Sequence, residues 1–231
     1  MIAPLPRLLH LRFACLLGIT LFSGGCASLD PHLDDLGPVY KPVNARGPAA
    51  WPTAIRRVAI LPAHDTSGRL PASFVTSYDT IWRRTLDRSQ RAEFLGLNRP
   101  QLRAWTAKET FSASGLLPPD LLLRIGRETD AQAVLFLDLN NATAYPPLSL
   151  SFRARLVDVT TGETLWMADE LFDSGRDSTA RAARRYAKAN GSGKGDTTSS
   201  IVQSPTRFAE YAFQAVCELL PPRIDPNAKS N

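Results

Sequence analysis

The sequence has 231 residues, 44% of them hydrophobic and 21% charged, which excludes wholesale disorder, collagen and coiled coil and predicts one folded domain with extensions. Its formal charge of +5 falls to +3 without the first 25 residues, because 25 basic residues (27 less Arg7 and Arg12) then face 22 acidic ones. So small a surplus does not indicate a nucleic-acid partner.

Residues 1–25 have the pattern of a bacterial export signal. Two arginines give a positive start, a ten-residue apolar run follows over 13–22, and small residues lead into Cys26. Ten apolar residues are too few to span a bilayer. The small-residue run ending in cysteine resembles the lipobox of bacterial lipoproteins, although Ser23 stands where that motif usually has Leu, Val or Ile. The resemblance implies acylation of Cys26; the alternative is an ordinary secretory signal in which this cysteine has no role.

Residues 26–53 have the composition of a linker. Prolines recur there at positions 31, 38, 42, 48 and 52 without apolar periodicity, which favours a stiff, extended tether. Ala27 and Ser28 follow the cysteine, and neither resembles the aspartate that holds enteric lipoproteins at the inner membrane. The resemblance therefore implies an anchor in the periplasmic face of the outer membrane. We expect a chain that begins near Thr53 to fold alone, because apolar periodicity starts only at Arg56.

Residues 54–222 carry the periodic patterns of an α/β domain. In chain order we expect a buried strand at 58–61, a helix at 70–88, a strand at 92–97, short helices at 98–107 and 118–128, a central strand at 133–139, a hairpin of strands at 148–157 and 165–172, and a closing helix at 204–219. This β-α-β-α-α-β-β-β-α order predicts a single α/β domain with helices packed on a mixed sheet. Residues 174–203 are expected to form a flexible basic insertion and 223–231 a disordered tail.

Four features of this domain resemble a fold shared by bacterial envelope proteins: the opening strand RRVAILP, the strand AQAVLFLDL after a helix ending RETDA, the hairpin RARLVDVTTGETLW and the closing amphipathic helix. The families are the curli secretion lipoprotein, the lipoprotein activators of penicillin-binding proteins and the N-terminal domain of the Tol-system propeller protein. The resemblance covers residues 56–220. It implies a role in assembly, secretion or protein contact and transfers no catalytic residue.

Few residues with catalytic or metal-binding chemistry fall in the domain. His64 is its single histidine and Cys217 its single cysteine, so neither a His/Cys zinc site nor an internal disulfide can form there. The helical pattern places this cysteine at the edge of an apolar arc, partly exposed. The run His64-Asp65-Thr66-Ser67 contains the residue types of a catalytic triad, but an Asx/Ser turn is the simpler interpretation. The run GSGKG at 191–195 lacks the first glycine and the Ser/Thr of a phosphate-binding loop, so we expect a linker there.

Carboxylates carry an alternative interpretation, an envelope hydrolase acting on a glycan or peptidoglycan. Asp169 and Glu170 are neighbours on a strand and point to opposite faces, which does not suit a cooperating pair. A second carboxylate from across the sheet would be needed, with aromatic side chains forming the walls of a pocket. The candidates for these roles are Asp138, Asp158, Trp105 and Trp166.

A basic stripe is the remaining candidate site. If 178–189 is helical, Arg181, Arg184, Arg185 and Lys188 lie at i, i+3, i+4 and i+7 on one face. One interpretation is a solvated face; the other is contact with an anionic envelope surface. We predict a non-enzymatic periplasmic lipoprotein without cofactors, anchored to the membrane through Cys26, that contacts an envelope protein or anionic polymer and binds no nucleic acid. A subunit of an outer-membrane secretion assembly is a further alternative.

Overall fold

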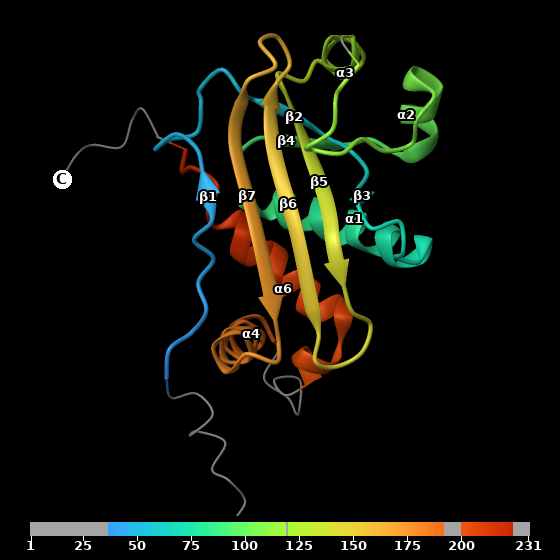
Figure 1. Ribbon diagram of the computed structural model, residues 1–231. Helices are drawn as coiled ribbons and strands as arrows, with labels where there is room; N and C mark the ends of the chain where they lie inside the picture. Colours follow the sequence, from blue (N-terminus) through green and yellow to red (C-terminus); the bar gives the residue numbers. More distant parts are fainter. Residues whose placement is uncertain (1–36, 119, 192–199, 224–231) are drawn as a thin grey trace, which may run out of the picture. The chain divides into compact units, whose positions relative to one another are not determined.

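The sheet contains seven strands, which the computed structural model describes within residues 37–118, 120–191 and 200–223. The strands are β1 (Ala45–Arg46), β2 (Arg57–Ile60), β3 (His64–Asp65), β4 (Glu93–Gly96), β5 (Ala133–Ala142), β6 (Ser149–Asp158) and β7 (Thr164–Asp173). Their order is β1-β7-β6-β5-β2-β4, with β3 paired to β5 (Figure 1). β2 is parallel to β4 and β5, whereas β5, β6 and β7 are antiparallel. The predicted mixed sheet is confirmed.

Local sequence explains where the helices begin. They are α1 (Ala72–Ser89), α2 (Arg99–Thr106), α3 (Leu121–Thr129), α4 (Asp177–Asn190) and α6 (Pro205–Cys217), with a 3-10 turn at Ile201–Gln203. The Asn98 side chain caps α2 by accepting from the Gln101 amide at 2.8 Å, while the Asn98 amide donates to the Gln101 side chain at 3.1 Å. Ser204 caps α6 ahead of a proline at its first position.

Helices lie on both faces of the sheet and give the domain two hydrophobic cores. α1 and α6 pack on the face behind the strands in Figure 1, around the aromatic rings of Trp82, Phe152 and Phe213. α2 and α3 pack on the other face, where Phe136 has no exposed surface. β5 therefore contributes side chains to both cores, which confirms 133–139 as part of a central strand.

β6 and β7 form the predicted hairpin. The Asp158 carboxylate accepts from the amides of Thr160 and Thr161 at 2.8 and 2.9 Å. Gly162 has φ of +71°, a conformation that strains residues with a Cβ. The turn chemistry expected from the sequence thus sets the register of β6 and β7, each ten residues long.

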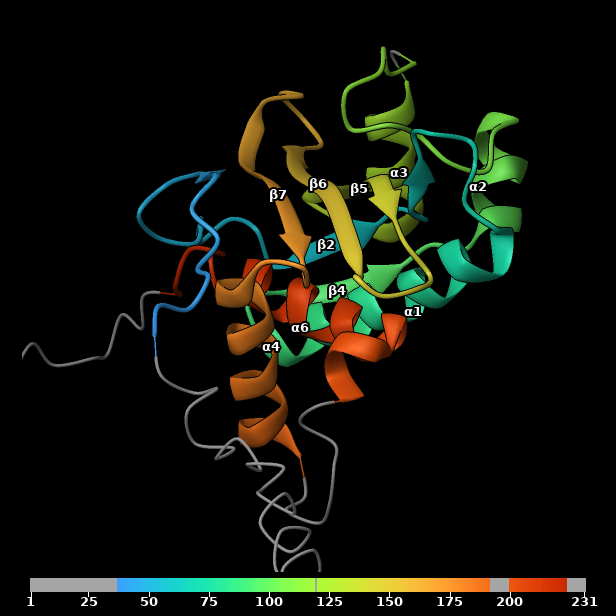
Figure 2. The same cartoon turned by 60° about the horizontal axis from the view of Figure 1, so that its bottom comes forward.

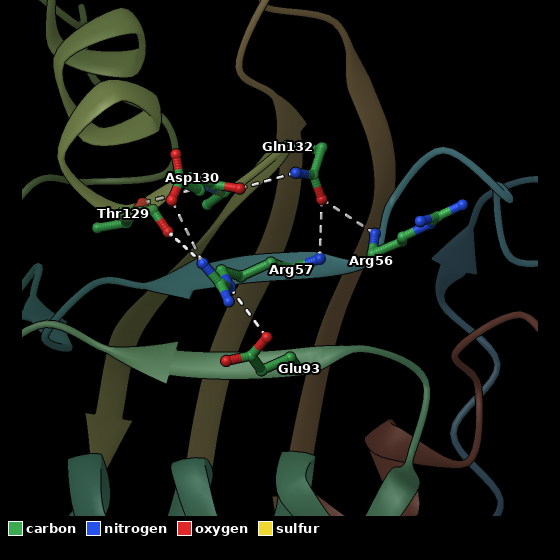
Figure 3. A network of polar contacts seen from close by, with 7 residues as sticks. Arg56, Arg57, Glu93, Thr129, Asp130 and Gln132 are labelled. Carbon is green, nitrogen blue, oxygen red and sulfur yellow. Dashed lines mark hydrogen bonds and ion pairs between the residues drawn. The ribbon is translucent and has the colours of Figure 1, made fainter.

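A polar network ties the N-terminal ends of the parallel strands together (Figure 3). Arg57 of β2 forms ion pairs with Glu93 of β4 at 2.9 Å and with Asp130 at 3.7 Å. The Gln132 side chain accepts from the amides of Arg56 and Arg57 at 3.1 and 2.9 Å. Because β2 is only four residues long, these bonds extend its attachment to both neighbours and to the end of α3.

The segment expected to be a linker packs on the domain from Gly37 onward, where the described compact unit begins. β1 pairs with β7, and Trp51, 4% exposed, joins the first core. Gly47 lies so close to Trp166 that an added Cβ would stand 2.7 Å from its Cδ1. The core therefore begins upstream of Arg56, contrary to expectation, because one edge of β7 offers unpaired backbone groups to this segment.

Glu170 holds the incoming segment in place. Glu170 is 6% exposed. Its carboxylate accepts hydrogen bonds from the amides of Val43 and Asn44, both at 2.6 Å, and from the Tyr40 hydroxyl. Burial and this hydrogen bond raise the pKa of Tyr40. A buried carboxylate is tolerated where donors surround it, so Glu170 serves the attachment of the N-terminal segment to β7.

Two expectations about the C-terminal third differ from the structure. Residues 177–190 form α4 in place of a flexible insertion, because buried Thr179, Ala180 and Ala183 give this segment a packing face. Cys217 is 3% exposed, inside the core and not at its boundary, and burial raises the pKa of its thiol. The predicted leader with Cys26, the stretch 192–199 and the tail from 224 lie outside the described residues.

Candidate functional site

The four basic residues of the stripe lie on one side of α4. At about 100° per residue they fall within an arc of roughly 100°, whereas Thr179 and Ala183, 1% and 0% exposed, lie on the opposite side. Arg185 and Lys188 are exposed, and the other two are half-buried. We call Arg181, Arg184, Arg185 and Lys188 the α4 basic face. The spacing seen in the sequence therefore becomes an outward-directed surface because the other side of α4 is buried.

Arg181 also has a structural contact within this face. Its Nε donates to the Pro38 carbonyl at 3.1 Å, and the guanidinium carbon would lie 3.3 Å from a Cβ added to Gly37. Nearby, the Tyr40 amide donates to the Ser178 carbonyl at 3.0 Å. α4 therefore contacts the segment with which the described part of the chain begins, and Figure 2 shows this segment beside the helix.

The carboxylates considered for hydrolysis are engaged in structural bonds. Asp138 is 1% exposed, and its carboxylate accepts hydrogen bonds from the Ser112 hydroxyl and the Ala113 amide, both at 2.9 Å. Arg153 stands opposite both Asp138 and Asp169 in the sheet and donates to the latter at 2.8 Å. An arginine thus separates the two carboxylates. The other two candidates belong to the hairpin turn and to the attachment of the N-terminal segment described above.

The run after β2 forms the expected turn. Asp65 accepts from the amide and hydroxyl of Ser67 at 2.9 and 2.7 Å and from the Leu70 amide at 2.8 Å. His64 contacts Thr110 instead, with 3.0 Å between Nδ1 and Oγ1. The serine, histidine and aspartate therefore do not form the chain of bonds that a triad needs, and the Asx/Ser turn is confirmed.

An ion pair lies in a cavity of about 480 Å³ beyond the C-terminal ends of β2 and β4. Arg99 is ion-paired with Asp79 and donates to the Ala63 carbonyl at 3.1 Å, while Asp79 accepts from the Ala63 amide at 2.6 Å. Burial raises the pKa of Asp79, and the amide and the guanidinium oppose that effect. These bonds join α1, α2 and the end of β2.

The remaining candidates from the sequence are not brought together. Trp166 is buried in the first core and Trp105 packs against the second, on opposite faces of the sheet. Residues 192–195 of the GSGKG run lie outside the described residues. Over 37–118, 120–191 and 200–223, no three His, Cys, Asp or Glu side chains gather in a way that would hold a metal ion. No helix in those ranges is both long and apolar enough to cross a membrane.

A second basic cluster has no counterpart among the sites expected from the sequence. Arg84 and Arg88 of α1 and Arg207 of α6 line a cavity of about 460 Å³, to which α4 contributes Tyr186. Arg84 is ion-paired with Glu210 of α6. The i, i+4 spacing on α1 was a partial signal, but α6 joins it only through the packing of the two helices.

No protein-family model and no curated protein matches the sequence. Among solved structures, the dodecamer of a PelC variant from Paraburkholderia phytofirmans is similar with a TM-score of 0.40 and 18% identity, over 74% of this chain and 97% of that chain. Lipoprotein GNA1162 from Neisseria meningitidis is similar with a TM-score of 0.39 and 14% identity, over 58% of this chain and 96% of that chain. The LpoB C-terminal domain from Escherichia coli is similar with a TM-score of 0.36 and 19% identity, over 55% of this chain and 85% of that chain. These similarities concern the fold alone, at TM-scores of 0.40 or lower.

Proposed function

We propose that this protein is a non-enzymatic, lipid-anchored periplasmic lipoprotein whose domain contacts an anionic envelope surface through the α4 basic face. The observation that carries the proposal is the position of this face, directed outward and beside the point where the chain enters the domain. The structural engagement of Asp138, Asp169 and Glu170 supports a role without catalysis. Ala27 after the cysteine supports the outer membrane as the site of the anchor.

Chain length supports a position close to the membrane. Cys26 and Gly37 are eleven residues apart, a stretch that spans at most about 40 Å when fully extended. The segment after Gly37 packs on the domain and adds no reach. A domain anchored through Cys26 therefore stays within that distance of its own membrane. Anionic headgroups attract nearby basic side chains by about 1 kcal/mol per residue.

Replacement of the lipidation residue tests the anchor. In Cys26→Ser we expect a protein that retains its leader and carries no acyl chain, because lipoprotein signal peptidase cleaves before an acylated cysteine. Mass spectrometry of the protein extracted from cells measures both properties. Cys15→Ser is the matched control, since this cysteine lies inside the leader, and its processing should be normal. Normal cleavage of Cys26→Ser would contradict the anchor and favour the secretory signal.

Neutralising three of the four residues of the α4 basic face tests the contact. The triple variant Arg184→Gln, Arg185→Gln and Lys188→Gln keeps Arg181, which the Pro38 carbonyl needs. At about 1 kcal/mol per residue, the loss of three charges should weaken binding to vesicles containing phosphatidylglycerol by roughly 100-fold. Vesicle sedimentation of an unlipidated chain starting at Ala27 measures this, and high salt should weaken the unmodified chain in the same direction.

The control variant removes three charges from other surfaces. Arg56, Arg69 and Arg127 are exposed and belong to other segments, before β2, before α1 and in α3, so replacing all three by glutamine gives the same net charge. This variant should keep most of the vesicle binding. Equal losses in both triple variants would mean that net charge alone matters, and salt-independent binding of the unmodified chain would contradict the proposed contact.

A further inference from the structure

A second basic site lies on the other side of α4 from its basic face. The cavity of about 460 Å³ between α1, α4 and α6 is lined by Arg84, Arg88, Tyr186, Asn190, Arg207 and Glu210, among others. At about 100° per residue, Asn190 is half a turn away from Arg181 on α4. The cavity therefore faces the α1–α6 side, and its volume is in the range of small-ligand sites.

The charge inside this cavity is unbalanced. Three arginines line it against one carboxylate, that of Glu210, which is ion-paired with Arg84. Arg207 donates to the Ser200 hydroxyl at 3.0 Å, a neutral partner. The Arg88 side chain is exposed, and its charge acts on Tyr186 at the wall of the cavity. The described residues of the lining thus have a net formal charge of two positive units.

Tyr186 adds a hydroxyl group to this charged environment. Burial raises the pKa of Tyr186, Glu210 raises it further, and Arg88 and Arg84 lower it. The Tyr186 hydroxyl therefore interacts electrostatically with the Glu210 carboxylate and with both arginines of α1. Its ring also packs on Tyr211 with 5.9 Å between centroids, which holds it at the wall of the cavity.

We propose that this cavity binds a phosphate group. Guanidinium groups offer paired N–H donors that match phosphate oxygens, and a phosphomonoester carries about −1.5 to −2 charges at neutral pH, close to the excess on the lining. Arg88 and Arg207 supply the uncompensated charge, Arg84 stays with Glu210, and the Tyr186 hydroxyl donates one further hydrogen bond. The inference does not depend on the proposed membrane contact, because the two sites use different sides of α4.

Calorimetric titration of the full-length protein in a neutral detergent tests the site. Inorganic phosphate and glycerol 3-phosphate should bind saturably, with chloride at equal ionic strength as the blank. Arg88→Gln and Arg207→Gln should each weaken binding about tenfold or more, and Tyr186→Phe should weaken it less. Both arginines are exposed, so each variant should keep the thermal unfolding transition of the unmodified protein.

Matched variants separate this site from the α4 basic face. Arg69→Gln removes one exposed charge elsewhere and should bind phosphate normally. The variant with Arg184, Arg185 and Lys188 replaced should also bind it normally, even if it loses vesicle binding. The absence of saturable binding, or equal binding by Arg88→Gln and the unmodified protein, would overturn the inference.

Mixed micelles distinguish the two sources of the phosphate group. If the natural ligand is a lipid headgroup, micelles containing phosphatidylglycerol should displace glycerol 3-phosphate, and Arg88→Gln should weaken both. If the ligand is a soluble phosphate compound, the micelles should leave the titration unchanged. Either result retains the site and identifies the class of molecule that carries the phosphate.

Discussion

Phe213→Ala should lower the free energy of unfolding by about 3–5 kcal/mol, the range for truncating a large buried aromatic side chain. Phe213 has no exposed surface and lies at the centre of the first core. Its ring centroid is 4.9 Å from that of Phe152, 5.1 Å from that of Trp82 and 5.8 Å from that of Tyr78. The cavity left by the ring would separate α6 from both α1 and β6, so little of it can collapse.

Chemical denaturation of the chain starting at Ala27 measures this loss. Tyr145→Ala is the matched control, because Tyr145 is 83% exposed and an aromatic ring is also removed. We expect the control to change stability by less than about 0.5 kcal/mol. A nearly neutral Phe213→Ala would contradict the packing of α6 against the sheet.

A chain that begins at Thr53 should be less stable than one that begins at Ala27 by at least about 3–5 kcal/mol, the range for removing a large buried aromatic side chain such as Trp51. The truncation removes the donors to Glu170 from Tyr40, Val43 and Asn44. It also removes Trp51 from the core. Parallel denaturation curves of the two chains measure the difference.

Glu170→Gln makes this test specific to the carboxylate. In the longer chain the substitution should destabilise by about 1–3 kcal/mol, because charge-assisted hydrogen bonds are lost. In the shorter chain the same substitution should change stability little, because the truncation removes the donors to Glu170 and opens its side chain to water. An equal loss in both chains would show that the N-terminal segment does not stabilise Glu170.

Most of the fold was predictable because its signals are local. The apolar run around Phe136, the alternation along β6, the cap at Asn98 and the turn at Gly162 each depend on residues within one element or one turn. The i, i+3, i+4 and i+7 spacing on α4 was visible for the same reason. A helix or strand expresses its own period wherever it later packs, so these elements and their order are confirmed by the structure.

The sequence by itself determined the longer strands, the helices other than α4, the mixed sheet, and the spacing that makes one side of α4 basic. Only the tertiary structure decided what covers the edge of β7 and what lines the cavity between α1, α4 and α6. Glu170 bonds to Tyr40, 130 positions away in the sequence, and Arg84 bonds to Glu210, 126 positions away. No periodic pattern or fixed spacing in the sequence indicates such partners. Their pairing follows from which surfaces the packed helices leave next to one another, a property that no single segment of the chain contains.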